Sequence, residues 1–211
     1  VEALTNNTQN ELNAILSQPL IMAEIIGYTI TNEKMFLGED LSAIENYQKS
    51  LMKSIKAKIP QISVISYGDE NGNYIGIRDN GEGKDFSLML KDSRTGGLLN
   101  IYEGDSINSN IISSIEGYDP RIRPWYEPVR KNIASSWSNI YINQDEKMEA
   151  TTSVSVPVFG NSGEFRGVFE IDVKLNGIND FLQKNKIKDN GVVFIVNDEL
   201  EIVAQSENHN N

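Results

Sequence analysis

The chain has 211 residues, enough to bury a substantial core, and carries a formal net charge of -11. This net charge argues against nucleic acid or an anionic membrane surface as a partner, because binding either would need a basic face. It has no cysteine, and its one histidine is His209 near the C-terminus. Disulfides, thiolate chemistry, a Ser-His-Asp triad and histidine-based metal sites are therefore excluded, no cofactor is expected, and binding is favoured over catalysis.

The first sixty residues show the spacing of two amphipathic helices. Apolar residues in 3–30 recur every three or four positions, which predicts a long helix, kinked near Pro19. A second helix is predicted over 41–57 and closed by Pro60. No apolar run reaches the ~20 residues of a membrane span, and no signal peptide is visible. The abrupt ends lead us to expect a fragment whose flanking membrane segments lie outside it.

After residue 60 short runs rich in Ile, Val and Leu alternate with turn residues, which is typical of antiparallel strands. Two hairpins are predicted, from "QISVISYG" to "YIGIRD" and from "FSLMLKD" to "LLNIYE". They are followed by a short helical piece over 107–116, a helix over 124–132, a strand over 137–143 and a final strand pair, "ATTSVSVPVF" with "EFRGVFEIDVKL". These elements predict an α+β fold with an antiparallel sheet of roughly five strands.

The C-terminal part begins with a predicted helix over 176–187. Beyond it, "GVVFIVNDELEIVAQS" repeats the strand, turn, strand pattern seen after residue 60 and predicts the start of a second, smaller sheet. The expected organisation is four parts. These are a helical region over 1–59, a sheet module over 60–175, a connecting helix over 176–190 and a partial second module over 191–211.

The stretch "YDPRIRPWYEP", residues 118–128, is the most unusual in the chain. Pro124 disfavours the α conformation at Arg123 and favours an extended one. We expect Arg123 at the N-cap of the 124–132 helix, where its guanidinium and free backbone N–H groups could bind a carboxylate or phosphate. The alternative is a structural role in which an arginine of this stretch pairs with Asp119 or Glu127.

Two later strands add polar groups on one face each. Strand alternation places Tyr141 and Asn143 together, and it places Glu170 and Asp172 opposite the core-facing side of their strand. Asp172, near an arginine and tyrosines, is a suitable partner for an ammonium group. It could equally be an ordinary solvent-facing acid.

The blocks "YDPRIRPWY", "WSNIYIN" and "GEFRGVFEIDVKL", in this order, resemble the double Cache (dCache) sensor domains of bacterial chemoreceptors, sensor histidine kinases and diguanylate cyclases. The resemblance implies a long stalk helix, a membrane-distal PAS-like module with a five-stranded antiparallel sheet, and the start of a membrane-proximal PAS-like module. It also implies a location on the extracytoplasmic side of the bacterial cell membrane, periplasmic or extracellular.

Within this family the chain is similar to the subset that binds amino acids. By this resemblance Arg123 and Trp125 would hold the α-carboxylate of the ligand. Asn143 departs from the pattern, because it stands where the subset often has a second acid. The α-ammonium would be held by Tyr118, Tyr141 and Asp172. The expected ligand-binding residues are Tyr118, Arg123, Trp125, Tyr126, Tyr141, Asn143 and Asp172.

The function expected is therefore that of a non-catalytic sensor for a small zwitterion, most simply an amino acid. One alternative is a sensor for a small carboxylate such as pyruvate, lactate or a dicarboxylate. Another is a structural or dimerisation module without a ligand. Whichever of these functions the chain has, its long N-terminal helix could pair with that of a second copy to give a homodimer.

Overall fold

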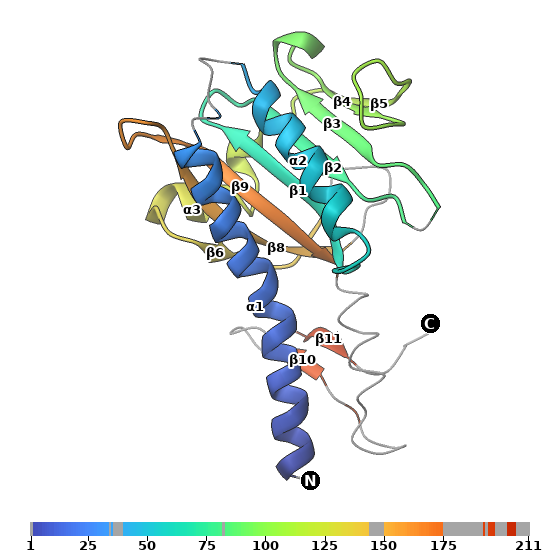
Figure 1. The fold of residues 1–211 in the computed structure, drawn as a ribbon, viewed down its shortest axis with the longest axis vertical. Helices are drawn as coiled ribbons and strands as arrows, with labels where there is room; N and C mark the ends of the chain where they lie inside the picture. The colour runs from blue at the N-terminus through green and yellow to red at the C-terminus, as the bar shows by residue number, and fades with distance from the viewer. Residues whose placement is uncertain are drawn as a thin grey trace.

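The structure is a computed structural model, whose fold is drawn in Figure 1. It describes residues 2–33, 35, 40–81, 83–143, 150–174, 192, 194–196 and 202–205. The helix expected over 176–187 lies outside these residues, as does His209. Of the expected second module, the structure describes a hairpin of β10 (Phe194–Val196) and β11 (Ile202–Gln205). The four domain boundaries remain predictions.

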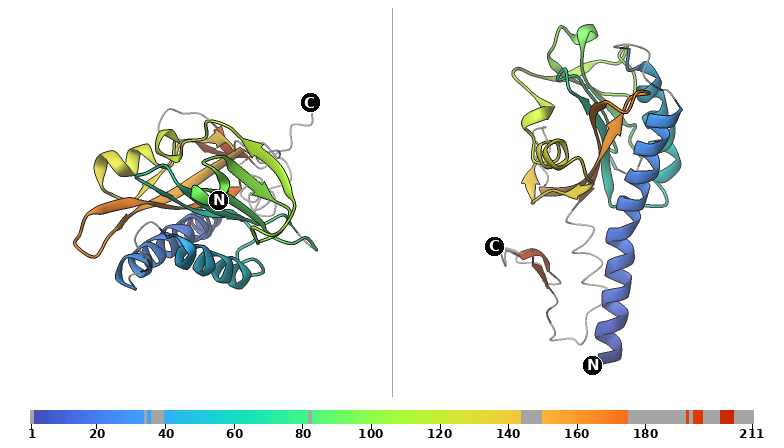
Figure 2. Two further views of the ribbon diagram at one scale, coloured as in Figure 1. Left: turned by 90° about the horizontal axis from the view of Figure 1, so that it is seen from above. Right: turned by 90° about the vertical axis from the view of Figure 1, so that its left-hand side faces the viewer.

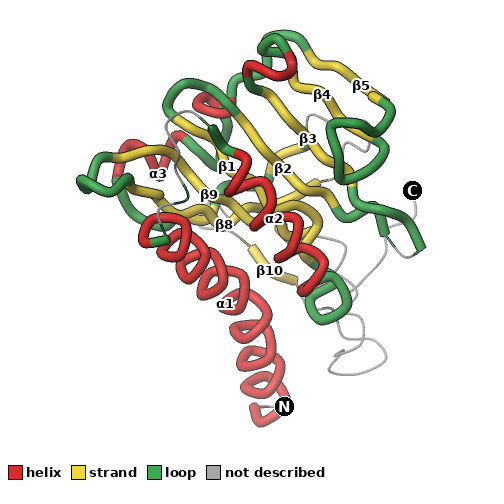
Figure 3. The backbone as a smooth tube through the Cα atoms, turned by 45° about the horizontal axis from the view of Figure 1, so that its top comes forward, coloured by secondary structure: helices red, strands yellow, loops and turns green. Residues whose placement is uncertain are grey.

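Both expected N-terminal helices are present. α1 (Glu2–Asn32) runs through Pro19 without a break in the helical assignment, and α2 (Ser42–Ile55) follows it. The two helices lie side by side on one face of the sheet (Figure 3). Both turn an apolar stripe towards the sheet, as their spacing predicts. The buried apolar residues are Ala23, Ile26 and Ile30 in α1, and Ile44, Met52 and Ile55 in α2.

The central element is one antiparallel sheet, which in the described residues has nine strands. Its strand order is β5-β4-β3-β2-β1-β9-β8-β6, and β7 also pairs with β8. Both predicted hairpins, β1 with β2 and β3 with β4, and the final pair of β8 with β9 are confirmed. The strands are β1 (Ile62–Asp69), β2 (Tyr74–Arg78), β3 (Ser87–Lys91), β4 (Leu99–Tyr102), β5 (Ile111–Ile115), β6 (Ser136–Trp137), β7 (Tyr141–Ile142), β8 (Ala150–Phe159) and β9 (Phe165–Lys174).

The helical piece predicted over 107–116 is wrong, because this segment contains β5, which pairs with β4. Its isoleucines fit a helical period as well as a strand, since short apolar runs do not distinguish the two. The backbone of β4 would otherwise be left without a partner on its outer side. Pairing with that edge therefore decides the conformation, and the sheet grows beyond the five strands expected.

The strand predicted over 137–143 is divided into β6 and β7. Trp137 pairs with Val154, whereas Tyr141 pairs with Thr151, so four steps along one strand match three along the other. The extra residue is a bulge, and it reverses the alternation of side chains. Trp137 accordingly packs with the helices, while Tyr141 packs against the opposite face of the sheet.

The sheet is covered on both faces, which divides the core into two clusters. One cluster lies between the sheet and α1 and α2. The other lies between the sheet and the segment 118–129, which contains the 3-10 helix η2 (Pro120–Ile122) and α3 (Glu127–Asn132). Figure 2 shows these two layers on opposite sides of the sheet. Strand β9 contributes to both, with Phe169 and Ile171 facing the helices and Glu170 and Asp172 facing segment 118–129.

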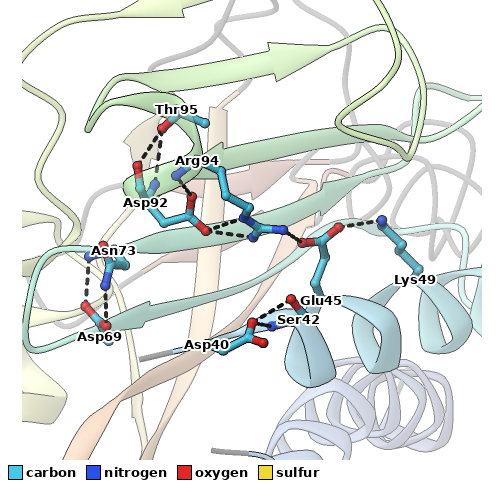
Figure 4. Close-up of polar contacts among 9 residues, drawn as sticks. All are labelled: Asp40, Ser42, Glu45, Lys49, Asp69, Asn73, Asp92, Arg94 and Thr95. Carbon is cyan, nitrogen blue, oxygen red and sulfur yellow. Dashed lines mark hydrogen bonds and ion pairs between the residues drawn. The ribbon is translucent and has the colours of Figure 1, made fainter. Parts of the chain in front are cut away.

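Charged side chains fix α2 to the turn between β3 and β4 (Figure 4). The Glu45 carboxylate, 8% exposed, contacts Lys49 Nζ at 2.6 Å and Arg94 Nη1 at 2.8 Å. Arg94 Nη2 also lies 2.6 Å from Asp92 Oδ2. Asp92 in turn caps the 3-10 helix η1 (Ser93–Thr95), which begins that turn. These contacts thus fix the position of α2 relative to the β3–β4 turn.

Truncation of a core residue of α2 tests this packing. Ile44 is fully buried, and we expect Ile44→Ala to lower the free energy of unfolding by about 2–5 kcal/mol, because it removes apolar contacts and leaves a cavity. The same substitution at Ile122, which is 72% exposed, should change it by less than about 0.5 kcal/mol. Urea unfolding followed by circular dichroism measures both. Equal effects at the two positions would contradict the assigned packing of α2.

Candidate ligand-binding site

The stretch "YDPRIRPWYEP" crosses the face of the sheet opposite α1 and α2. Arg123 has φ -82° and ψ 151°, which confirms the extended conformation expected before Pro124. The helix predicted from 124 starts later, because α3 begins at Glu127. Pro128 has no N–H to bond back into the preceding turn, so it suits the first helical turn and fixes the start there. Arg123 therefore precedes a turn, and its carbonyl accepts the N–H groups of Tyr126 and Glu127 at 3.0 and 3.2 Å.

The two arginines of this stretch have different surroundings. Arg121 Nη2 lies 2.7 Å from Asp119 Oδ2, and its Nη1 donates to the Glu70 carbonyl at 3.2 Å. The structural role considered for an arginine of the stretch is thus filled by Arg121. Arg123 is half-buried, and its guanidinium has no hydrogen-bond or ion-pair partner among the described residues. The Cζ atom of Arg123 lies 5.7 Å from the centroid of the Tyr141 ring. This distance permits a cation–π contact.

The side chains of Tyr126 and Arg123 lie on opposite sides of this segment. Its ring is fully buried, and its hydroxyl donates to Glu70 Oε1 at 2.8 Å. Arg130 Nε also contacts that oxygen, at 2.9 Å. Tyr126 and Glu70 therefore attach the segment to the β1–β2 turn, and the structure does not bring Tyr126 into contact with the cavity described next.

A cavity of about 30 Å³ lies between this segment and the sheet. Six of the seven expected residues line it, and they come from three separate blocks of the sequence. These six are Tyr118, Arg123, Trp125, Tyr141, Asn143 and Asp172. The apolar part of the lining comes from β1, β3 and β4. It consists of Val64, Met89, Leu99 and Ile101.

Close packing between the segment and the sheet sets the position of Trp125. A Cβ atom at Gly68 in β1 would lie 2.9 Å from both Pro120 Cβ and Trp125 Cη2. Only a glycine lets the indole ring come this near to the strand. Trp125 also packs against Tyr74, with ring centroids 6.2 Å apart, and Tyr74 meets Tyr118 at 5.2 Å. These contacts set the orientation of the three rings in the aromatic wall of the cavity.

Asp172 is the centre of a buried hydrogen-bond network. Its Oδ1 accepts from Ser153 Oγ at 2.5 Å and from Tyr141 Oη at 3.0 Å, and its Oδ2 accepts from Asn143 Nδ2 at 3.3 Å. The side chain is 2% exposed, so it is not an ordinary solvent-facing acid. Burial raises the pKa of the Asp172 carboxyl, and the hydrogen bond from Ser153 opposes this shift.

Two further charged residues line the cavity that were not expected to do so, Glu170 and Arg78. Glu170 is 2% exposed, and Arg78, at the end of β2, is 3% exposed. Burial raises the pKa of the Glu170 carboxyl well above its ordinary value, and the nearby Asp172 charge raises it further. Strand alternation alone puts Glu170 beside Asp172, so that signal was present in the sequence. Nothing in "YIGIRD" distinguishes Arg78 from a solvent-exposed residue at the end of a strand.

A sheet with helices on one face and a small charged cavity on the other defines the class of PAS-like ligand-binding sensor domains. The family model described as methyl-accepting chemotaxis protein-like, first PDC sensor domain, matches residues 68–180, more than half of the chain. The chain belongs to this family of sensor domains. The described helices include none that is both long enough and apolar enough to cross a membrane.

Similar proteins agree with this family. The methyl-accepting chemotaxis protein McpB of Bacillus subtilis (strain 168) is 22% identical over an alignment of 205 residues, which covers 93% of this chain and 30% of that protein. The sensory domain of the Campylobacter jejuni chemoreceptor Tlp3 (CcmL) has a TM-score of 0.65 at 14% identity, over 97% of this chain and 69% of that one. The ligand-binding domain of the Pseudomonas fluorescens chemoreceptor CtaA, solved with L-serine, has a TM-score of 0.61 at 15% identity, over 94% and 67%.

The buried acids predict how stability depends on pH. The pKa values of Glu170 and Asp172 are raised in the folded state, so the folded chain retains protons that the unfolded chain releases. Their contribution to stability is therefore complete below the ordinary values of 4.5 and 3.8 and is lost as the pH rises. The slope from each group reaches at most about 1.4 kcal/mol per pH unit.

Glu170→Gln should remove the larger part of this loss, because the amide does not titrate. Urea unfolding between pH 5 and pH 8 should show the free energy of unfolding falling less steeply for the variant than for the parent chain. Parallel curves would mean that Glu170 is not held protonated by the fold.

Proposed function

We propose that the chain is the extracytoplasmic ligand-binding domain of a bacterial transmembrane chemoreceptor and that its cavity binds an amino acid. One observation carries the proposal. The Arg123 guanidinium lines the cavity without a hydrogen-bond or ion-pair partner among the described residues, and two buried carboxyl groups, Asp172 and Glu170, line the same cavity. A zwitterion has a carboxylate for the first and an ammonium group for the second.

The similar proteins support this choice of ligand. The Tlp3 sensory domain has been solved with isoleucine bound and the CtaA domain with L-serine bound. In the present chain Arg123 and Trp125 are proposed to hold the α-carboxylate, and Tyr118, Tyr141, Asn143 and Asp172 to surround the α-ammonium. A sensor of this kind performs no catalysis. A small carboxylate is the less favoured ligand, because it would leave the two acids without a function.

Binding is proposed to change the conformation of the domain. A volume of about 30 Å³ accommodates about two water molecules, so an amino acid can enter only if the lining moves. Met89 is a flexible side chain in that lining. Segment 118–129 forms the wall of the cavity that faces the sheet. The ligand would therefore favour a second, more open arrangement of this wall.

α1 is placed to transmit such a change. It packs on the far face of β8, where a Cβ atom at Gly27 would lie 2.7 Å from Val156 Cγ2. The Phe159 N–H of the same strand donates to Thr31 Oγ1 at 3.2 Å. Since β8 also carries Ser153, which contacts Asp172, one strand connects the cavity to the helix. A shift at the acids is thus proposed to move α1.

A homodimer through α1 is also proposed. Ile21, Ile25 and Tyr28 are 54%, 60% and 71% exposed, and their spacing of four and then three residues places them on one side of the helix. This heptad-like spacing of exposed apolar residues suits the pairing of two parallel helices. The partner proposed is a second copy of this chain.

Arg123→Ala should weaken amino-acid binding at least about 30-fold, because it leaves the ligand carboxylate without its charged partner, at a cost of about 2–5 kcal/mol. Isothermal calorimetry should measure this with whichever of the twenty proteinogenic amino acids raises the melting temperature most. Arg94→Ala is the matched control, since Arg94 is paired with Glu45 of α2 and does not line the cavity. Retention of full affinity in Arg123→Ala, or equal losses in both variants, would refute the assignment.

Ile25→Cys should give a disulfide-linked dimer on mild oxidation, because the two copies of this position would face each other across the helix pair. The chain has no cysteine of its own, so the cross-link reports on this position alone. Ile122→Cys, at a site 72% exposed on the other side of the sheet, should remain monomeric on a non-reducing gel. Equal cross-linking of both variants would indicate random collision rather than a helix pair.

A further inference from the structure

The two acids of the cavity differ in how much hydrogen-bonding capacity they have left. A carboxylate offers about four lone-pair positions. Asp172 already accepts three hydrogen bonds, from Ser153, Tyr141 and Asn143. About one position therefore remains for a ligand, whereas an ammonium group brings up to three N–H donors. Asp172 alone cannot satisfy such a group.

Glu170 has the capacity that Asp172 lacks. Its Oε1 accepts from Ser66 Oγ at 2.5 Å, and its Oε2 is buried with no hydrogen-bond partner among the residues that the structure describes. An oxygen of this kind is costly to bury, so native structures rarely leave one unsatisfied without a reason. Since Glu170 lines the cavity, a ligand donor placed there would supply the missing hydrogen bond.

The residues next to Glu170 in the sheet are small. It stands opposite Ser66 of β1 and Ser155 of β8, and Gly76 follows Ser66 in the same row. The space above Gly76 is taken by two cavity-lining side chains, since a Cβ atom there would lie 2.7 Å from both Met89 Cε and Tyr74 Oη. Glu170 and Asp172 are two residues apart on β9, which separates their Cα atoms by roughly 6.6 Å. One ammonium group can therefore reach both carboxyl groups.

We propose that Glu170 is the principal acceptor for the ligand's ammonium group and that it makes the cavity select amino acids over 2-hydroxy acids of the same carbon skeleton. This inference rests on the proposed function. An ammonium satisfies Oε2 with a charge-assisted hydrogen bond. A 2-hydroxy acid has no positive charge at that carbon and only a single O–H donor, so it gains much less from Glu170.

The charged groups around Glu170 determine how its protonation responds to a bound ligand. Asp172 on β9 and the hydroxyls of Tyr74 and Tyr118 face it, as do Arg123 from segment 118–126 and Arg78 from β2. In the empty cavity burial favours the protonated acid, and an arriving ammonium favours the carboxylate. Amino-acid binding should therefore release a proton from Glu170, and the affinity should rise with pH.

The first test compares Glu170→Gln with the parent chain by calorimetry. The probes are the L-amino acid that raises the melting temperature most and its 2-hydroxy analogue, with L-alanine and L-lactate as the smallest such pair. The variant should bind the amino acid at least about 30-fold more weakly, while its affinity for the hydroxy acid changes less than about threefold. Glu45→Gln is the matched control, since Glu45 is an equally buried acid on α2, outside the cavity.

Unchanged amino-acid affinity in Glu170→Gln would overturn the inference while the proposed function stands. Failure of the parent chain to bind any amino acid would instead refute the proposed function. If Glu170→Gln does not fold, the parent chain decides the question by calorimetry at pH 6.5 in phosphate and in imidazole buffers, which differ in ionisation enthalpy. A difference in the observed binding enthalpy that corresponds to proton release is expected, and identical enthalpies would overturn the inference.

Discussion

Two carboxyl groups buried side by side on β9 are the constraint on which the site depends. Glu170 and Asp172 share one face of a strand whose other face, with Phe169 and Ile171, belongs to the core beneath the helices. Buried acids are costly unless they are paired, hydrogen-bonded or protonated. Here Ser66, Ser153, Tyr141 and Asn143 provide the hydrogen bonds, and the raised pKa values show that burial still dominates. Two buried acids thus line the same cavity as Arg78 and Arg123.

The positively charged side of the cavity depends on one short stretch of the chain, in which some side chains anchor the segment and one reaches the cavity. Arg121 is paired with Asp119, and Tyr126 and Arg130 are joined through Glu70, so these residues fix the segment to the β1–β2 turn. Arg123 is thereby held extended over the cavity with its guanidinium available. The segment and the sheet thus place a guanidinium and two carboxyl groups on facing walls of one cavity.

Sequence patterns were sufficient where local chemistry decides the conformation. The prolines around Arg123 set its extended backbone, and strand alternation put Tyr141 with Asn143 and Glu170 with Asp172. The same sequence patterns failed where a partner distant in the sequence decides the local conformation. β5 is a strand because β4 has a free edge, and the bulge after Trp137 depends on the register with β8. The cavity position of Arg78 and the burial of Tyr126 outside the cavity could not be predicted, because each depends on which layer covers which face of the sheet.

The central claim is that a small zwitterion binds between the Arg123 guanidinium and the carboxyl groups of Glu170 and Asp172. The most direct measurement is a crystal structure of the chain with the compound that stabilises it most in a thermal-shift screen of amino acids and organic acids. The account predicts an amino acid in the electron density, with its carboxylate at Arg123 and its ammonium at the two acids. Density for that compound elsewhere, or a best-stabilising compound without an ammonium group, would contradict it.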